Sequence, residues 1–313
     1  MSLAIGVDLG GTKIAAGVVD EAGQILDERR QPTPTSSAEA VVDAMVSMIR
    51  ELQAAHPVTA VGIGAPCFIA HDRDYVMFTA NLPIRDIRLG SAVAEKTNLP
   101  TIVENDANAA AWAEFQFGAA RGATDMVLIT LGTGLGGGLV ANGELIRGAF
   151  GVAAEVGHIE MVHGGRRCGC GLVGCWEAYA SGSGFVRTAR ELAAERPTDA
   201  TVLLALGDGT AEGLQGMHVT EAARKGDPVA TEAFRVTGEY IGRGLAILGT
   251  VLDPSTYVIG GGLSDASDLF MHHVTAAFAE HISARAHRPQ AKFNVAVLGN
   301  AAGIVGAADL ARR

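Results

Sequence analysis

The sequence predicts an α/β protein built in two halves. Short apolar runs that end in glycine-rich turns alternate with longer stretches in which apolar residues recur at helical spacing. A strand–turn–strand unit near the amino terminus is repeated coarsely about 120 residues later. The chain of 313 residues is long enough for about two domains, and its hydrophobic content of 48% is enough to form sizeable cores.

The first half opens with a predicted β-hairpin. The apolar runs 3–7 and 13–19 flank a turn made of Gly10, Gly11 and Thr12. Apolar spacing predicts the other elements of this half, which are a helix around 41–52, strands over 60–63 and 101–103, and a helix over 107–117.

The second half repeats this pattern. Apolar runs over 126–131 and 136–140 flank a second turn, and residues 151–184, which are rich in Gly, Cys and His, indicate irregular structure. The remaining predicted elements are a helix over 231–252, strands over 257–259 and 295–298, and a helix over 304–310.

The composition disfavours several classes of partner. The net charge is −10 and the pI is about 5.4, whereas a nucleic-acid binder needs basic side chains to neutralise phosphates, so we expect no nucleic-acid partner. The sequence has no run of 18 or more apolar residues, so we expect no membrane span. The first residues lack the basic and apolar regions of a secretory signal, and we therefore expect a cytoplasmic protein.

The first turn has the composition of a phosphate-binding loop. Gly10 and Gly11 let the backbone turn sharply and bring its N–H groups close to a phosphate, and Thr12 adds a hydroxyl donor. Asp8 comes just before the turn, where its carboxylate could hold Mg²⁺ directly or through water. Lys13 adds a positive charge on the other side.

Gly132, Thr133 and Gly134 form the equivalent turn in the second half, and Gly261 and Gly262 follow a third strand, where a purine or ribose could lie against the backbone. Either loop alone could be an ordinary glycine turn. Two such loops in the two halves of one chain favour a shared nucleotide. Neither loop has the Gly-Lys-Ser/Thr ending of the P-loop, so that nucleotide fold is not implied.

Asn105 and Asp106 lie at a predicted strand-to-helix junction. Phosphoryl transfer to a hydroxyl needs a positioned acceptor and a group that receives its proton, and one carboxylate suits the second task. The partial positive charge at a helix start favours the ionised form of Asp106, and Asn105 can donate to and accept from sugar hydroxyls. The alternative is that one of the two residues only caps the helix, and both roles can coexist.

A histidine and three clustered cysteines form a candidate metal site. His158, Cys168, Cys170 and Cys175 supply four ligands of the kind that bind tetrahedral Zn²⁺, with the spacing H-x9-C-x-C-x4-C. The alternative is three reduced, buried thiols and an unrelated histidine. If one ring nitrogen of His158 binds zinc, the other can donate to a sugar hydroxyl. Cys67 lies far away in sequence, and we expect it to pack in the core.

The three glycine motifs resemble the two phosphate motifs and the adenosine motif of the actin-like ATPase superfamily, which includes sugar kinases, actin and heat-shock chaperones. The resemblance extends from Asp8 to the glycines near 306. It implies an α/β, two-domain actin-like ATPase (ribonuclease H-like) fold with a cleft between the lobes. We expect a small α/β domain over 1–111, completed by a C-terminal helix over 301–313, and a large α/β domain over 112–300 that carries the zinc-binding loop.

The segment from Glu155 to Glu177 narrows the resemblance to the ROK family of repressors, open reading frames and kinases, whose signature combines a Gly-His pair, a zinc-binding cysteine cluster and a nearby Glu. Residues 104–111, 155–158 and 168–182 resemble those of glucokinases of the actinobacterial type. This resemblance implies ATP-dependent phosphorylation of glucose to glucose 6-phosphate by direct transfer. The chain departs from the usual family pattern at Cys67, where a glycine is common.

The resemblance also implies a role for each matching residue. Asp106 is the implied catalytic base. The residues implied to hold the sugar are Asn81, Asn105, Asp106, Glu155, His158 and Glu177. The residues implied to hold ATP and Mg²⁺ are Asp8, Gly10, Gly11, Thr12, Lys13, Gly132, Thr133, Gly134, Gly261 and Gly262. The residues implied to hold a structural Zn²⁺ are His158, Cys168, Cys170 and Cys175.

Other interpretations remain open. A kinase for mannose, fructose or N-acetylmannosamine, or one that uses polyphosphate as donor, would need similar residues. A sugar-sensing regulator of the same family carries a DNA-binding helix-turn-helix before the first loop, and because seven residues precede Asp8 we expect none here. An actin-like or chaperone ATPase binds ATP but no sugar, and the set of Glu155, His158 and Glu177 disfavours it. The family resemblance suggests a homodimer or homotetramer.

Overall fold

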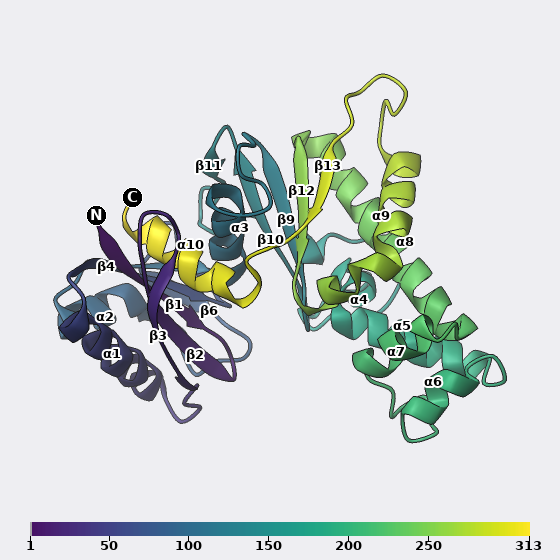
Figure 1. Cartoon of the computed structure of the whole chain (residues 1–313), viewed down its shortest axis with the longest axis horizontal. Coiled ribbons are helices and arrows are strands. Elements are labelled where there is room, and N and C mark those ends of the chain that lie inside the picture. Colours follow the sequence, from purple (N-terminus) through teal and green to yellow (C-terminus); the bar gives the residue numbers. More distant parts are fainter. Residues whose placement is uncertain (1) are drawn as a thin grey trace. The chain divides into compact units, whose positions relative to one another are not determined.

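The computed structural model describes residues 2–313 (Figure 1). Helices and strands alternate along the chain and the strands form three sheets, which confirms the predicted α/β class. Residue 1, with which the expected small domain begins, lies outside the described residues. Within the described part of the chain, no helix has the length and apolar character needed to cross a bilayer.

Contacts divide the chain into two compact units. Unit 1 contains the residues up to Leu128, together with Gly137–Ala154 and Ala296–Arg313. Unit 2 contains Ile129–Gly136 and Glu155–Val295. The last helix therefore belongs to the same unit as the first strand.

A five-stranded sheet in the order β3-β2-β1-β4-β8 forms the centre of unit 1. Its strands are β1 (Leu3–Leu9), β2 (Lys13–Val19), β3 (Ile25–Pro32), β4 (Val58–Ala65) and β8 (Thr101–Asn105). Strand β1 pairs antiparallel with β2, as the predicted hairpin requires, and parallel with β4, which pairs parallel with β8. The carboxyl ends of β1, β4 and β8 therefore lie at one edge of the sheet.

The described residues of unit 1 also contain four helices and a small sheet. The helices are α1 (Ala38–Ala55), α2 (Leu89–Thr97), α3 (Asp106–Gln116) and α10 (Ala302–Ala311), and the small sheet contains β5 (Phe68–Ile69), β6 (Tyr75–Phe78) and β7 (Ile87–Arg88). Met45, Ile49 and Leu52 of α1 are buried in the core, which is the face that their helical spacing predicts.

Helix α10, from the far end of the sequence, lies against β1, β4 and α3 (Figure 1). Glycines make this close packing feasible. A Cβ atom on Gly6 would lie 1.8 Å from the carbonyl oxygen of Ile304, and one on Gly62 would lie 1.8 Å from that of Ala307. Since neither backbone oxygen can move without shifting the helix, the sheet and α10 fit together only with glycine at both positions.

The second five-stranded sheet has the order β11-β10-β9-β12-β13. Its strands are β9 (Met126–Leu131), β10 (Leu135–Ala141), β11 (Glu144–Leu145), β12 (Thr256–Gly260) and β13 (Lys292–Val295). The helices of unit 2 are α4 (Glu177–Ala180), α5 (Gly182–Glu195), α6 (Thr201–Leu206), α7 (Gly216–Arg224), α8 (Pro228–Leu252) and α9 (Ser267–His281), with 3₁₀ turns η1 (Val156–His158) and η2 (Gly262–Ala266).

Helix α8 ends where the sequence predicts. Asp227 caps its start by accepting from the N–H groups of Val229 and Ala230, and Asp253 ends it in the left-handed conformation, directly before Pro254. Among the described residues, the expected irregular structure over 151–184 is interrupted by η1, α4, the first turn of α5 and two isolated β-bridges.

One predicted strand is wrong in position. The sequence predicts a strand over 295–298, but β13 covers Lys292–Val295 and the next residues are not in a strand. The N–H groups of Val297 and Leu298 donate hydrogen bonds to Oε1 of Glu114, at 2.9 and 2.8 Å. This buried carboxylate takes the place of a strand partner where the chain re-enters unit 1.

Candidate functional site

Unit 1 gathers the predicted polar residues at the carboxyl edge of its parallel strands. The strand register pairs Asp8 with Gly64, and Gly64 with Glu104. Asn105 ends β8, and Asp106 begins α3 directly after it. Asp8 and Asp106 lie near enough for the charge of Asp106 to act on Asp8. The sheet topology therefore brings together two carboxylates that are separated by almost 100 residues in sequence.

Asn105 caps helix α3 and leaves the next residue at the start of the helix. Its Oδ1 accepts from the N–H groups of Ala107 and Asn108, at 2.9 and 3.1 Å. Its Nδ2 lies 3.4 Å from the carbonyl oxygen of Cys67, at the distance limit of a hydrogen bond. The capping role that the sequence allows for this pair therefore belongs to Asn105, and Asp106 is not needed as the cap.

The two carboxylates titrate above the usual range for aspartate. Burial raises the pKa of Asp106, although the N–H of Ala107, 2.8 Å from Oδ1, lowers it in part. Burial is also the largest cause of the raised pKa of Asp8, which is about 6; the charge of Asp106 raises it further and Lys13 lowers it. A carboxylate with a raised pKa is a better proton acceptor, and a buried pair of carboxylates favours a bound cation.

The first glycine loop is a tight turn with an exposed tip. Gly10 donates its N–H to the carbonyl oxygen of Lys13 at 3.0 Å, and the Thr33 hydroxyl donates to the carbonyl oxygen of Gly10 at 2.6 Å. Gly11 and the next two residues are exposed. A Cβ on Gly11 would lie 3.9 Å from the Cβ of Asn81, so the structure brings this predicted sugar contact beside the loop.

A buried ion pair beside Asn105 was not predicted from the sequence. The carboxylate of Glu104 is completely buried and lies 2.8 Å from Nε of Arg147 and 3.7 Å from Nε of Arg73. Its Oε1 accepts from the N–H of Asn105 at 3.0 Å and from Nδ2 of Asn108 at 3.1 Å. The pair therefore fixes the backbone that carries the two site residues, and no local pattern relates residues this far apart in sequence.

Cys67 packs in the core of unit 1, as expected. It is 4% exposed, and burial raises the pKa of its thiol to about 12. The thiol is therefore protonated at neutral pH and unreactive.

Unit 2 contains the second glycine loop, between β9 and β10. Gly132 donates its N–H to the carbonyl oxygen of Gly134 at 3.0 Å, and a Cβ on Gly132 would meet nothing within 4 Å. Gly261 has a φ of 84°, and a Cβ there would lie 2.5 Å from the nitrogen of Leu131. The third glycine motif therefore packs directly on the end of β9, which only glycine permits.

A cavity of about 1160 Å³ opens beside this loop within unit 2. Gly132, Thr133 and Gly262, three of the residues predicted to hold the nucleotide, are among those that line it. Residues from α5, α7 and the segment before α7 form much of its apolar and basic wall, including Val186, Arg190, Leu214 and Met217. Sequence reasoning missed this wall; the amphipathic spacing of 182–195 was the signal that could have indicated it.

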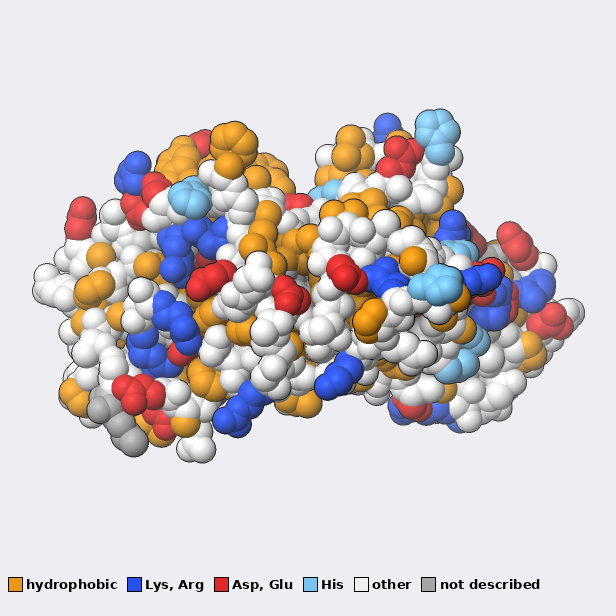
Figure 2. Space-filling view, turned by 90° about the horizontal axis from the view of Figure 1, so that it is seen from above, with side chains coloured by type: hydrophobic (Ala, Val, Ile, Leu, Met, Phe, Trp, Pro, Cys, Tyr) orange, Lys and Arg blue, Asp and Glu red, His pale blue; other side chains and the backbone are white. Residues whose placement is uncertain are grey.

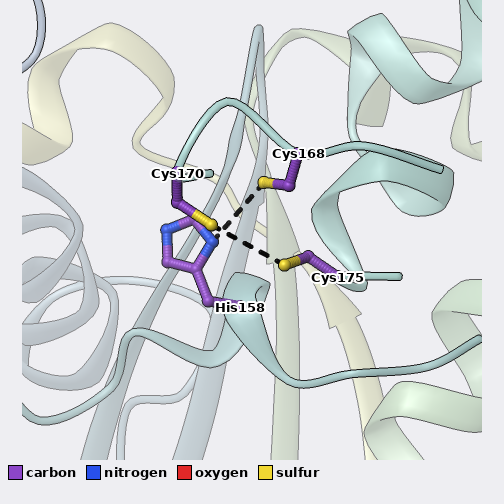
Figure 3. Close-up of side chains that lie close together, drawn as sticks. All are labelled: His158, Cys168, Cys170 and Cys175. Carbon is purple, nitrogen blue, oxygen red and sulfur yellow. Dashed lines mark hydrogen bonds between the residues drawn. The ribbon is translucent and has the colours of Figure 1, made fainter. Parts of the chain in front are cut away.

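The four predicted metal ligands converge in unit 2. His158, Cys168, Cys170 and Cys175 point toward one another (Figure 3), and their ligand atoms lie within 4.8 Å of one another. Nδ1 of His158 is 3.7 Å from Sγ of Cys168, and the sulfurs of Cys170 and Cys175 are also 3.7 Å apart. Zn–S bonds of about 2.3 Å in a tetrahedron would separate two sulfurs by about 3.8 Å. The cluster therefore fits Zn²⁺.

The other ring nitrogen of His158 faces a glutamate. Nε2 lies 4.0 Å from a carboxylate oxygen of Glu155, which is exposed. Burial raises the pKa of the Cys168 thiol, and a bound cation would favour its thiolate. Glu177 is close to the cluster as well, with Oε1 3.3 Å from Sγ of Cys168.

Charged side chains outside these sites are mixed. Figure 2 shows separate groups of Lys and Arg with Asp and Glu between them on one face of the molecule.

Comparisons with known proteins agree with the motifs. A model of the ROK family matches residues 4–313. A glucokinase of Streptomyces coelicolor is 50% identical over 312 residues, which cover 100% of this chain and 98% of that protein. An N-acetylmannosamine kinase of Escherichia coli is 33% identical over 317 residues, covering 98% of each chain. A crystal structure of a ROK family glucokinase from Streptomyces griseus in complex with glucose and AMPPNP matches with a TM-score of 0.87, 50% identity and 99% coverage of both chains.

Proposed function

The chain belongs to the ROK family, and from this premise we propose that it is an ATP-dependent glucokinase, which transfers the γ-phosphoryl group of ATP to the C6 hydroxyl of glucose. The observation that carries this proposal is the 50% identity with Streptomyces glucokinases along the whole chain. The same identity to a glucokinase with glucose and AMPPNP bound supports both substrates. The actin-like fold of these kinases accounts for the two glycine loops and the helix that follows β8.

In this proposal Asp106 is the catalytic base. Its raised pKa suits it to accept the proton of the sugar hydroxyl, and its place in the first turn of α3 keeps it clear of the capping role. Asp8 helps to position Mg²⁺. Burial raises the pKa of Asp8 to about 6, and the charge of a bound Mg²⁺ would favour the ionised form of this carboxylate. Asn105 uses its free amide hydrogen to donate to a sugar hydroxyl, because its oxygen caps the helix.

The phosphates of ATP are assigned to the two glycine loops. Gly10, Gly11, Thr12 and Lys13 form one loop, and Gly132, Thr133 and Gly134 form the other. The open space beside Gly132 and the cavity of about 1160 Å³ next to it support a nucleotide there, with Gly261 and Gly262 against the adenosine.

The metal cluster is assigned a structural role. His158 and the three cysteines would hold Zn²⁺, which supplies folding energy to a loop with little secondary structure of its own. With Nδ1 directed to the metal, Nε2 of His158 is left to donate to a sugar hydroxyl beside Glu155 and Glu177. Asn81, next to the first loop, would add a further sugar contact.

Several finer points belong to the same proposal. Because one relative is an N-acetylmannosamine kinase, this sugar remains the alternative substrate. We propose a cytoplasmic location because metal-binding thiolates must stay reduced, and a homodimer or homotetramer. We also keep the division into a small domain over 1–111 with 301–313 and a large domain over 112–300.

A coupled assay across hexoses and phosphate donors tests the function. ATP with glucose should give the highest kcat/KM in the parent protein. Asp106→Asn keeps the shape of the side chain and an oxygen for the N–H of Ala107, and should lower kcat by roughly 10²-fold to 10⁴-fold while glucose affinity, measured by calorimetry, stays within a few-fold. Asp43→Asn removes a remote, exposed carboxylate on α1 and should leave kcat unchanged. Turnover close to the parent in Asp106→Asn would exclude this residue as the base.

A further inference from the structure

The side chain of Glu177 lies between the metal cluster and the second glycine loop. Its Oε2 accepts the N–H of Leu135 at 2.9 Å, at the point where the loop enters β10. Its Oε1 lies 3.3 Å from Sγ of Cys168. Cys175, another ligand of the cluster, is only two residues before Glu177 in sequence. One carboxylate therefore touches the metal-binding segment and the loop assigned to phosphate at the same time.

A further hydrogen bond from the segment after Glu177 fixes the same loop. Gly182, at the start of α5, donates its N–H to the carbonyl oxygen of Gly132 at 2.8 Å. A Cβ on Gly134 would lie 2.5 Å from Oε2 of Glu177, so the glycine admits the carboxylate. Thr133, Cys168 and Glu177 also line one cavity of about 270 Å³. The loop thus receives its support from the segment that carries the metal ligands.

The loop needs such support because its own side chains supply almost none. Glycine loses more conformational entropy on ordering than any other residue, so a Gly-Thr-Gly turn is costly to hold in one conformation. A hydrogen bond from a backbone N–H to a carboxylate is stronger than one between neutral groups. The contact with Leu135 is therefore suited to hold the loop in one conformation before a nucleotide arrives.

We propose that Glu177 is a positioning residue for the nucleotide. Its side chain connects the metal-binding segment to the second phosphate loop and orders that loop in the absence of sugar. This inference rests on the proposed kinase function and goes beyond the sugar contact assigned to Glu177 there. The remaining lone pairs of its oxygens leave it able to accept from a sugar hydroxyl as well. A bound metal would act on the loop by fixing Cys168 and residues 175–177, which place the Glu177 carboxylate.

The two roles of Glu177 predict different measurements. A sugar contact changes the affinity for glucose and leaves the affinity for ADP in the absence of sugar unchanged. A positioning role changes the affinity for ADP without sugar. The substitutions that separate them are Glu177→Ala, which removes the acceptor for the Leu135 N–H, and Glu177→Gln, which keeps an oxygen acceptor at the same reach.

Titration calorimetry with Mg-ADP, without sugar, is the first measurement. Glu177→Ala should bind ADP on the order of tenfold more weakly than the parent, and Glu177→Gln should stay within about threefold. Hydrogen exchange of the Leu135 amide should be faster in Glu177→Ala and should change much less in Glu177→Gln, which keeps a neutral acceptor. Zinc content and the circular dichroism spectrum of each variant establish that the cluster and the fold are intact.

Gly134→Ala provides a second test that leaves the carboxylate in the chain. The added Cβ would push Oε2 away from Leu135, so exchange of the Leu135 amide should rise and ADP affinity should fall. Adding Glu177→Ala to this variant should cause little further loss, because the contact is already broken.

Parent-like ADP affinity in Glu177→Ala would overturn the inference and leave a sugar contact alone. Equal loss in Glu177→Ala and Glu177→Gln would also overturn it, because the amide retains the acceptor. If Glu177→Ala does not fold, unchanged Leu135 exchange in Gly134→Ala overturns it. Failure of the parent to bind ADP at all would instead refute the proposed kinase function.

Discussion

Replacing Asp8 by asparagine should stabilise the protein above pH 6 and remove its activity. Burial raises the pKa of Asp8 to about 6, with a further contribution from Asp106, whereas the ordinary value is 3.8. Because the folded pKa is the higher one, the folded state is favoured when the group is protonated. The stabilising contribution is complete below pH 3.8 and is lost as the pH rises through about 6. An amide of the same shape carries no charge at any of these pH values.

The two pKa values differ by about two units, and each unit corresponds to 1.36 kcal/mol, so at pH 8 the charged carboxylate costs the folded state at most about 3 kcal/mol. Partial exposure of the side chain and the screening it brings make the actual cost smaller. A gain of 1 kcal/mol raises the melting temperature of a domain of this size by roughly 2 to 4 °C. Asp8→Asn should therefore melt up to about 10 °C higher than the parent at pH 8.

Thermal unfolding by circular dichroism at pH 4 and pH 8, without Mg²⁺ or nucleotide, measures this difference. The gain should nearly vanish at pH 4, where the folded parent is already protonated. Asp106→Asn removes the neighbouring charge, so the double variant should gain less than the sum of the two single gains. Asp43→Asn, on the exposed surface, should gain nothing. A gain of equal size at both pH values, or none at pH 8, would refute the reasoning.

Three further predictions concern the fold and the metal. Gly62→Ala should destabilise the protein by roughly 3 kcal/mol or more in denaturant titrations, because its Cβ would lie 1.8 Å from a carbonyl oxygen. Gly132→Ala, whose Cβ would meet nothing within 4 Å, should keep the parental stability and weaken ADP binding. His158→Ala should lose bound zinc by elemental analysis and melt at lower temperature; parental zinc content would contradict the ligand set. Arg147→Met should lower the free energy of unfolding, measured by denaturant titration, by up to roughly 3–5 kcal/mol, because the buried charge of Glu104 loses this partner. Adding Glu104→Gln should restore part of that free energy.

Local sequence predicted the elements that local interactions decide. The hairpin around Gly10 and the end of α8 before Pro254 follow from turn chemistry and helix-stop signals, and both lie where expected. The strand predicted over 295–298 failed because its apolar residues are equally compatible with an extended crossing segment. Its N–H groups bond to Glu114, more than 180 residues earlier in sequence, which no local pattern indicates.

The candidate site in unit 1 also combines features that the sequence indicated with features that only packing produced. The motif around Asn105 indicated a helix start with a spare carboxylate, and the structure shows that cap at Asn105. Burial in the assembled core raises the pKa values of both Asp8 and Asp106, and the charge of Asp106, which the sheet topology brings near Asp8, raises that of Asp8 further. The ion pair between Glu104 and Arg147 is equally a product of packing.

The sequence by itself determined the α/β class, the family, the glycine loops and the ligand set of the metal cluster, because each depends on residue types at short, fixed spacing. Only the tertiary structure decided that the four ligand atoms lie within 4.8 Å of one another, that a cavity opens beside Gly132, and that Glu177 touches the loop at Leu135. The physical reason is that these features depend on distances between residues far apart in sequence. Such distances are set by how sheets and helices pack, and short motifs carry no information about them.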